Sequence, residues 1–541
     1  MNGPAQGFTR PRLPVVLLIL IAFAAGAVVM IVELAAARIL TPFFGQSVFV
    51  WTNVIGVILA ALAAGNYLGG RLADSSSSLK PLFGLLALAG GFCLLSPMAI
   101  GRVAHLFLGE NLQLEEAFPL LIRGSFVTTL FVFAPPVLLL GTALPFVVSE
   151  AARSYGRVGR ASGSVYAAST LGSILGTFLT TYFLIETFGS RGTFFLSGAV
   201  LMLLSGIGIV ATSRRTAGRW SGGVLIVATI GCAFLVPDRA ASWGRGVIWA
   251  EESRYQYLRV VEAAQDPRTL YLCVNEGIHS FESIYREGDV LSGGQYYDFY
   301  TLLPCLAGRH EAGDVCIIGL AAGTIARQYA HFFGASGALQ IDGVEIDPAV
   351  IEAGYRYMDL AFADPWLNVF NDLDGRVFLN AVAREYDVII IDAYSQQIYI
   401  PFHLATEEFF ALVEARLRPG GILGINVSGF RREEPVIEAI ANTAAKIFGS
   451  VTLARIPEGR NFMLYTVKGQ GHVAPRDVNS SSLPKELKPL LAGISAFGSS
   501  RAAVHDPRKP LLQDDHAPLE IMSDRALAAR SQILINSISG R

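Results

Sequence analysis

Residues 315–333 read VCIIGLAAGTIARQYAHFF, and this stretch decides the fold of the C-terminal half of the 541-residue chain. The apolar run at 315–318 is typical of a buried strand, and residues 325–333 have the pattern of a helix. Gly319 and Gly323 lie in the turn between them, where glycines let the backbone approach a nucleotide at a helix N-terminus. The stretch therefore predicts the first strand, turn and helix of a doubly wound α/β sheet.

Acidic residues follow the later predicted strands at positions that suit the same ligand. The second strand contains Glu345, about 20 residues after the glycine turn, where an acid would hold a ribose diol. The third element carries Asp374 and Gly375, a pair that suits a base edge, and the fourth apolar strand ends at Asp392. Ligands of open α/β sheets bind at the carboxyl ends of the strands. These acids, in this order, favour a nucleotide site over separate helix caps or loop residues.

Further strands complete the C-terminal half. The apolar stretches 421–427 and 461–467 complete a class I methyltransferase-like, Rossmann-like sheet, and residues 255–285 predict a small β-hairpin lid. Charged residues return at ordinary density from about residue 251. We therefore predict four parts, namely a polytopic membrane domain at 1–240, a β-rich lid subdomain at 241–312, a nucleotide-binding catalytic domain at 313–470 and a C-terminal extension at 471–541.

The N-terminal part has the composition of a multi-span α-helical membrane bundle. Apolar residues make up 52% of the chain and charged residues only 16%, below the roughly 25% usual in soluble proteins. A bilayer core needs about 20 apolar helical residues per crossing. We count about seven such spans, at 13–40, 48–70, 82–108, 120–149, 162–185, 193–212 and 222–237.

Lysine and arginine in the short loops predict the orientation of these spans. The basic clusters lie before the first span and after the second, fourth and sixth spans, so all fall on one side, the expected cytoplasmic side. They comprise Arg10, Arg12, Arg71, Lys80, Arg153, Arg157, Arg160, Arg214, Arg215 and Arg219. Seven true spans would then place the C-terminal half outside the cytoplasm, where nucleotide cofactors are scarce. Either the 222–237 segment is re-entrant or interfacial, or the C-terminal half faces outward. We expect a multi-pass protein of the cell membrane with its catalytic domain in the cytoplasm.

Charge and cysteine usage exclude other classes. The net charge of -2 and the lack of a basic run argue against a nucleic-acid partner. The five cysteines are scattered without metal-ligand spacing, so we expect free thiols and no metal site.

Small residues at 65–69 and 172–176 predict close contacts between membrane helices. The lipid bilayer is thus one expected partner.

The chain resembles the polyamine aminopropyltransferases, or spermidine synthases, in their membrane-fused form with a transporter-like N-terminal region. The motifs that carry the resemblance are ELAAAR at 33–38, GNYLGGRLAD at 65–74, ESRYQY at 252–257, GQYYD at 294–298, GLAAGT at 319–324, VEID at 344–347, Asp374-Gly375 and YDVIIID at 386–392.

The resemblance implies transfer of an aminopropyl group from decarboxylated S-adenosylmethionine, a co-substrate, to a small-molecule amine such as putrescine. It implies no permanently bound cofactor and a possible homodimer. Asp392 would accept the proton of the attacking ammonium, whose pKa is near that of lysine, about 10.4. By the same carry-over, the donor would contact Gln256, Gly319, Gly323, Glu345, Asp374 and Gly375, and the acceptor would contact Gln295, Asp298 and Tyr394.

Two positions depart from the family pattern. Ala321 stands where the family usually has an Asp that binds the donor's ammonium, and Ser395 where a second Asp holds the far end of a diamine. Two alternatives therefore stay open. One is a transferase that uses S-adenosylmethionine on another nucleophile, with Arg327 or His331 near the donor carboxylate. The other is a non-catalytic sensor or transporter that binds a nucleoside or polyamine.

Overall fold

The computed structural model describes residues 14–526, apart from 46–47, 77, 105, 107–121, 156, 214–215, 234–245, 276–280, 395–398, 430, 458–459, 482 and 497. The chain divides into two compact units, Met1–Ala241 and Ser242–Arg541. Of the residues named in the sequence analysis, Arg10, Arg12, Arg214, Arg215 and Ser395 lie outside the described residues.

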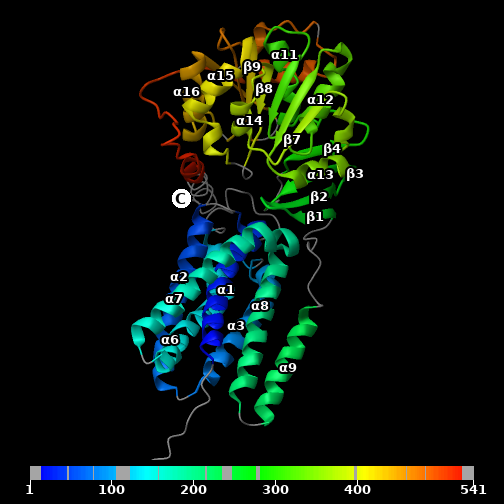
Figure 1. The fold of residues 1–541 in the computed structure, drawn as a ribbon. Helices are drawn as coiled ribbons and strands as arrows, with labels where there is room; N and C mark the ends of the chain where they lie inside the picture. The colour runs from blue at the N-terminus through cyan, green and yellow to red at the C-terminus, as the bar shows by residue number, and fades with distance from the viewer. Residues whose placement is uncertain are drawn as a thin grey trace, which may run out of the picture. The chain divides into compact units, whose positions relative to one another are not determined.

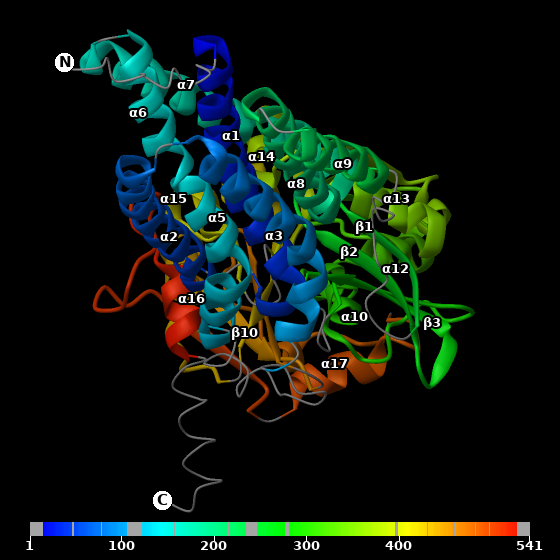
Figure 2. The same cartoon turned by 90° about the horizontal axis from the view of Figure 1, so that it is seen from below.

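The first unit is a bundle of helices in which α1 contacts α2, α6, α7 and α8 (Figures 1 and 2). Its elements are α1 (Val15–Phe44), α2 (Val48–Ser75), α3 (Lys80–Ala104), the π segment η1 (Thr129–Phe133), α5 (Ala134–Gly141), α6 (Ala143–Tyr155), α7 (Val158–Leu179), the π segment η2 (Thr180–Leu184), α8 (Ile185–Thr212) and α9 (Thr216–Ala233). Five described helical stretches are long and apolar enough to cross a membrane, judged by length and composition.

The fifth of these stretches, Val158–Thr212, has 55 residues. At 1.5 Å per residue it would be about 80 Å long, far more than the roughly 30 Å of a bilayer core. Gly189 interrupts it with φ 66 and ψ 171, which divides it near the boundary between the predicted spans 162–185 and 193–212. Helix α9 covers the described part of the predicted span 222–237 and is not among the five. The number of crossings therefore stays a prediction.

Close contacts between helices explain the small residues of the first unit. A Cβ on Gly172 in α7 would stand 2.0 Å from the carbonyl oxygen of Phe23 in α1. A Cβ on Gly65 in α2 would stand 2.1 Å from the carbonyl oxygen of Leu138 in α5. Any larger residue would push these backbones apart. The predicted packing role of both patterns is confirmed.

The second unit contains an eight-stranded sheet with the order β12-β10-β11-β9-β8-β5-β6-β7. Its strands are β5 (Asp314–Ile318), β6 (Gln340–Glu345), β7 (Leu367–Asn371), β8 (Tyr386–Ile391), β9 (Leu417–Ser428), β10 (Ser450–Arg455), β11 (Asn461–Val467) and β12 (Ser500–Val504). Strands β5 to β9 pair in parallel, and β11 runs antiparallel to β9. The order reverses between β5 and β8, so a ligand crevice is expected at the carboxyl ends of these two strands.

Helices cover both faces of this sheet (Figure 1). One face carries α10 (Tyr296–Tyr300), α11 (Leu303–Leu306), α12 (Thr324–Phe333), α13 (Pro348–Tyr357) and α17 (Lys488–Ser495), and the other carries α14 (Gly375–Ala381), α15 (Glu407–Arg416) and α16 (Pro435–Phe448). Alternation along β5 sends Ile317 into the first core and Ile318 into the second. The predicted Rossmann-like fold is confirmed.

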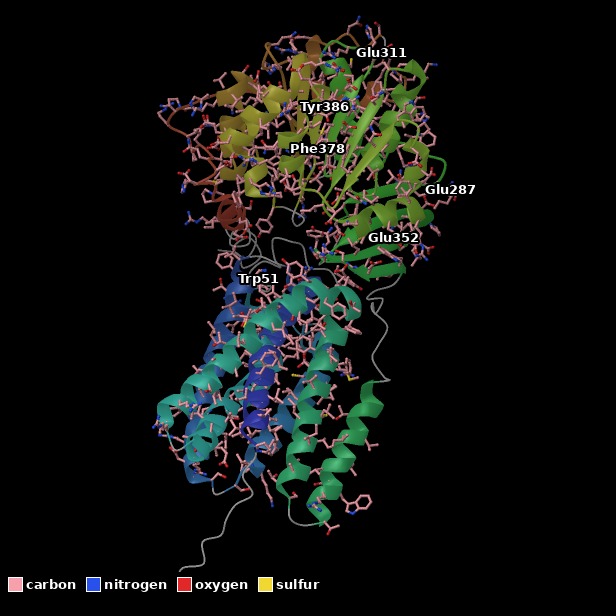
Figure 3. The ribbon with its side chains drawn as sticks, viewed as in Figure 1. Trp51, Glu287, Glu311, Glu352, Phe378 and Tyr386 are labelled. Carbon is pink, nitrogen blue, oxygen red and sulfur yellow. The ribbon has the colours of Figure 1, made fainter. Side chains whose placement is uncertain are left out.

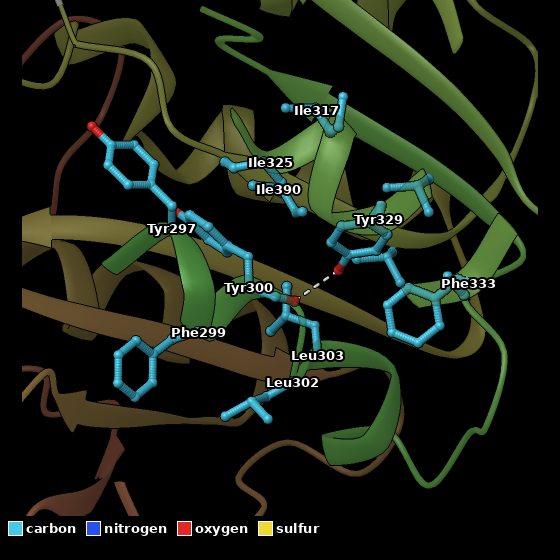
Figure 4. Packing of buried hydrophobic residues seen from close by; sticks show 14 of the residues in the cluster. Tyr297, Phe299, Tyr300, Leu302, Leu303, Ile317, Ile325, Tyr329, Phe333 and Ile390 are labelled. Atoms are coloured by element: carbon cyan, nitrogen blue, oxygen red, sulfur yellow. Dashed lines mark hydrogen bonds between the residues drawn. The ribbon is translucent and has the colours of Figure 1, made fainter. Parts of the chain in front are cut away.

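Aromatic residues fix the position of α10 in the first core. The Tyr329 hydroxyl on α12 donates a hydrogen bond of 2.8 Å to the carbonyl oxygen of Tyr300 (Figure 4). On the other face, Phe378 and Tyr386 lie in the interior, whereas Glu311 projects from the surface (Figure 3). The core therefore holds α10 beside the carboxyl end of β8.

The predicted hairpin lid is a four-stranded antiparallel sheet in the order β1-β2-β3-β4. The strands are β1 (Val247–Glu252), β2 (Tyr257–Ala263), β3 (Asp266–Val274) and β4 (Ser283–Arg286). Leu258 and Leu272 of this sheet pack with Ala322 of the glycine turn and Val350 of α13. The lid is thereby attached to the region where the sequence predicts the nucleoside.

Candidate active site

The glycine turn after β5 lies against the residue that follows β8. Gly319 has φ 84, and a Cβ there would stand 2.5 Å from the carbonyl oxygen of Asp392. The backbone amide of Asp392 donates a bond of 2.8 Å to the carbonyl of Ile318. Gly323, with φ 91, is the N-cap residue that precedes α12. Glycine is thus required for the close approach that brings the turn and Asp392 together.

Glu345 ends β6 beside the same turn. Its carboxylate accepts hydrogen bonds from the backbone amides of Ala321 at 2.9 Å, Ile346 at 2.9 Å and Asp347 at 3.1 Å. Burial raises the pKa of Glu345 to about 7, although the bonds from these amides favour the anion. Ala321 has φ 49 and contributes an amide, and no carboxylate, to the turn. The Glu345 position suits a group that donates hydrogen bonds, such as a ribose hydroxyl.

The turn between β1 and β2 bridges two strand ends of the large sheet. The Ser253 hydroxyl donates 2.6 Å to the Asp347 carboxylate and accepts from the Gln256 amide at 3.0 Å. The Tyr255 hydroxyl donates 3.2 Å to Asp372, which follows β7. These contacts bring the backbone of Gln256 next to the ends of β6 and β7. Nothing in the sequence alone indicated that Ser253 and Asp372 hold the turn between β1 and β2.

Asp374 caps α14. One carboxylate oxygen accepts two backbone amides of the first turn at 2.9 and 3.0 Å, and the other lies 2.9 Å from Nε2 of His403. The hydrogen bond with His403 is the main cause that lowers the pKa of Asp374. A Cβ on Gly375 would stand 2.2 Å from the Ile318 side chain. Asp374 and Gly375 therefore lie beside β5. His403 is a partner of Asp374 that the sequence analysis did not identify.

Asp392 heads a polar network that enters the sheet. Asn426 on β9 donates 3.2 Å to the Asp392 carboxylate and accepts 2.7 Å from the Asn461 side chain. Burial raises the pKa of Asp392 well above its usual range, and the charge of Glu282 adds to the rise. Asn426 was missed, although a polar residue inside an apolar strand was the signal that could have found it.

Tyrosines surround this carboxyl group. The hydroxyl groups of Tyr296 and Tyr300 partly offset the rise in the pKa of Asp392. The rings of Tyr296 and Tyr297 lie 4.0 Å apart. Tyr394 donates 2.8 Å to the Asn426 carbonyl oxygen. The predicted residue Tyr394 therefore lies near Asp392. The other tyrosines around Asp392 were not predicted as site residues.

The structure does not bring Asp298 to this group. Its side chain is 0% exposed. Its oxygens accept bonds from the Ser292 amide and hydroxyl and from Gln328, each at 2.7 Å, and from the Gly294 amide at 2.8 Å. Asp298 thus holds the loop before α10 and has no exposed oxygen for a substrate. Gln295 precedes Tyr296 at the start of α10.

The two cations considered for a donor carboxylate have partners within the structure. Arg327 forms an ion pair of 3.7 Å with Asp359 and lies 4.6 Å above the Tyr285 ring. His331 contacts the Phe332 ring. Among the described residues, no group of His, Cys, Asp and Glu is arranged to hold a metal ion.

Comparisons with known proteins show which families and proteins this chain resembles. Residues 305–478 match the family described as the spermine/spermidine synthase domain. A probable polyamine aminopropyl transferase of Bifidobacterium longum is 30% identical over 302 residues, which cover 53% of this chain and 64% of that protein. Polyamine aminopropyltransferase 1 of Streptomyces coelicolor is 25% identical over 78% of this chain and 77% of its own length.

Among solved structures, the probable spermidine synthase from Corynebacterium glutamicum covers 49% of this chain and 96% of its own, with 17% identity and a TM-score of 0.38. The strand order described above, and not this low score, establishes the fold. The chain spans just under two thirds of the length of the Bifidobacterium relative. The C-terminal half of this chain therefore carries a spermine/spermidine synthase domain, which follows an N-terminal region of apolar helices.

Proposed function

We propose that this chain is a membrane-bound polyamine aminopropyltransferase that uses decarboxylated S-adenosylmethionine and an amine such as putrescine. The observation that carries the proposal is the position of Asp392. This partly buried carboxyl group stands where the glycine turn meets β8, among tyrosines and on the same strand edge as Glu345. The names of the relatives support the same activity.

In the proposed reaction the amine nitrogen attacks the aminopropyl carbon bound to the sulfonium. Asp392 takes the ammonium proton and later releases it to water. A new nitrogen–carbon bond forms while the carbon–sulfur bond breaks, and its electron pair goes to sulfur to give neutral methylthioadenosine. The raised pKa of Asp392 brings the acid closer to the pKa of an alkyl ammonium, about 10.4, and so favours this transfer.

For the donor, Glu345 would accept bonds from the ribose hydroxyls, and Asp374 with Gly375 would meet the adenine. Gln256 would cover the nucleoside from the lid, since its turn is tied to Asp347 through Ser253. These residues lie at the ends of β6, β7 and the lid turn, next to the glycine turn. The donor sulfur would then stand near the Asp392 side chain, beside the glycine turn.

For the acceptor, Glu282 offers a second negative charge. It lies just before β4, where its amide donates 2.8 Å to the Leu272 carbonyl. Its charge contributes to the raised pKa of Asp392, Tyr296 and Tyr394, so it acts electrostatically on all three groups. Two carboxyl groups and aromatic rings favour a cation such as a protonated amine. We propose that Glu282 takes the part of the acid that is absent at position 395.

The test is turnover by the purified full-length protein with labelled decarboxylated S-adenosylmethionine and putrescine. We expect aminopropylated amine and methylthioadenosine, and Asp392→Asn should lower kcat by about 100-fold or more, the usual contribution of a positioned base. Asp364→Asn is the matched control, because Asp364 is exposed and its side chain bonds only to Tyr355 among the described contacts. Methyl transfer from S-adenosylmethionine would favour the other transferase, and binding without turnover the sensor.

A further inference from the structure

The C-terminal extension follows a defined path over one face of the large sheet. Strand β12 pairs with β10 at the sheet edge. The chain then runs along α16, where the Asp506 amide donates 2.8 Å to the side chain of Asn442 and the Leu512 amide donates 3.1 Å to the hydroxyl of Thr443. Asn442 and Thr443 are buried. These side chains fix the course of the extension, most of which lies beyond the matched family domain, 305–478.

Beyond α16 the extension reaches the start of α14. The Asp514 carboxylate accepts two bonds from the guanidinium of Arg376, at 2.7 and 2.6 Å. It also accepts 2.7 Å from the hydroxyl of Thr406, which caps α15. An exposed ion pair usually adds little, but a forked arginine–carboxylate pair fixes geometry as well as charge. Asp514 therefore ties the first turn of α14 to the cap of α15.

Arg376 passes this contact on to Asp374. The guanidinium donates 3.1 Å to the carbonyl oxygen of His403, and the His403 ring lies 2.9 Å from Asp374. The backbone amide of Arg376 donates 2.9 Å to the other Asp374 oxygen. Both oxygens of Asp374 are thus oriented by Arg376, one through its amide and one through His403. Asp374 is the residue proposed to meet the adenine.

A second anchor lies further along the extension. The Tyr399 hydroxyl donates to the carboxylate of Asp524, and both side chains are buried. Tyr399 belongs to the connection between β8 and α15, the same connection that begins at Asp392. The extension is therefore fixed at two points near the carboxyl edge of the sheet.

We infer that Asp514 is a positioning residue for the nucleoside site, so that donor binding depends on a segment beyond the matched family domain. Asp514 fixes the Arg376 fork, the fork fixes His403, and His403 with the Arg376 amide sets the orientation of the Asp374 carboxylate toward the base. This inference rests on the proposed function of Asp374. It assigns the extension a role in recognition of the donor, with no part in the chemical step.

The test is calorimetric titration of the full-length protein with methylthioadenosine. We expect Asp514→Asn to weaken binding by about tenfold, the effect of losing one charged, forked contact. In turnover, KM for the donor should rise while kcat stays within about twofold, because Asp392 is untouched. Arg376→Lys keeps the charge without the fork, should weaken binding in the same direction, and serves if Asp514→Asn does not fold. In a double variant the two effects should not add.

Asp506→Asn is the control, because Asp506 lies on the same extension but its side chain bonds only to Arg508 among the described contacts. Equal losses in Asp506→Asn and Asp514→Asn, or wild-type affinity in Asp514→Asn and Arg376→Lys, would overturn the inference while the proposed function stands. Failure of the wild-type protein to bind any adenosyl ligand would overturn both.

Discussion

Glu345 shows how a single buried carboxyl group links pH to ligand binding. Its free-protein pKa is raised to about 7 by burial, and a ribose diol would donate hydrogen bonds to the anion. Binding would therefore require loss of a proton below that pKa. The affinity for methylthioadenosine should rise about tenfold per pH unit below 7 and level off above it.

Calorimetry between pH 5.5 and 8.5 checks this prediction. Glu345→Gln should bind weakly and without this pH dependence. A wild-type affinity that falls as pH rises through 7 would contradict the assigned role of the carboxylate. The nearby Asp374 contributes little to this profile, because its pKa is lowered and it stays ionised across the range.

Individual site residues differed in how well the sequence predicted them. Glu345 ends β6 and Asp392 follows β8. Strand ends of a parallel sheet meet at one edge, so order alone brought the two residues together. Asp298 was assigned by its place in a motif, but its burial and four hydrogen bonds could not be read from that motif. His403 and Asn426 were missed because their contacts join segments far apart in the chain.

Among elements, the turn after β5 makes the sharpest demand on its sequence. Gly319 combines φ 84 with a contact of 2.5 Å from a hypothetical Cβ to the Asp392 carbonyl. Gly319→Ala should abolish methylthioadenosine binding and cost about 1–3 kcal/mol of stability, through strain and displacement of the turn from β8.

Gly337→Ala separates these two causes. Gly337 has φ 73 with nothing within 4 Å of a Cβ, so it carries the strain without the collision. It should lose about 1 kcal/mol and keep wild-type affinity. Thermal unfolding and calorimetry on both variants measure the difference, and equal affinities would show that the close approach is unimportant.

Other elements followed their patterns unequally. The apolar runs at 315–318 and 386–391 are strands β5 and β8 because a buried parallel strand is apolar on both faces. The lid gained β1 and β4 beyond the predicted hairpin, since half-buried strands of mixed polarity give a weak signal. Residues 162–212 are predicted as two spans, and the helix is interrupted at Gly189, between the predicted limits of these spans.

On the scale of the whole molecule, the side of the membrane on which the α/β unit lies depends on whether the number of membrane crossings is even or odd. Composition predicted the division into two units because charged residues return near the boundary at Ala241. That number depends on whether α9 crosses the membrane and on whether the helical stretch interrupted at Gly189 crosses it once or twice. Hydropathy decides neither question. Helix α9 packs along α8, where a Cβ on Gly206 would lie 3.0 Å from the Gly222 carbonyl oxygen. The cytoplasmic location and the homodimer both stay predictions.

Cysteine labelling tests the location of the α/β unit. Glu311 is exposed between α11 and β5 (Figure 3). We expect Glu311→Cys to react with a membrane-impermeant maleimide only after cells are permeabilised, because the donor nucleoside is expected in the cytoplasm. The native chain, whose described cysteines are buried except for partly exposed Cys305, gives the background. Labelling in intact cells would place the unit outside.

The extension along α16 also bears on how this protein is divided in the laboratory. The matched family domain ends at residue 478, yet β12 and Asp514 come after it and the lid strands come before it. A fragment cut at the limits of the match would lack an edge strand, the lid and one half of the Arg376 fork. The limits of the family match are therefore poor boundaries for an expressed fragment. Failure of such a fragment to bind nucleosides would say nothing about the intact chain.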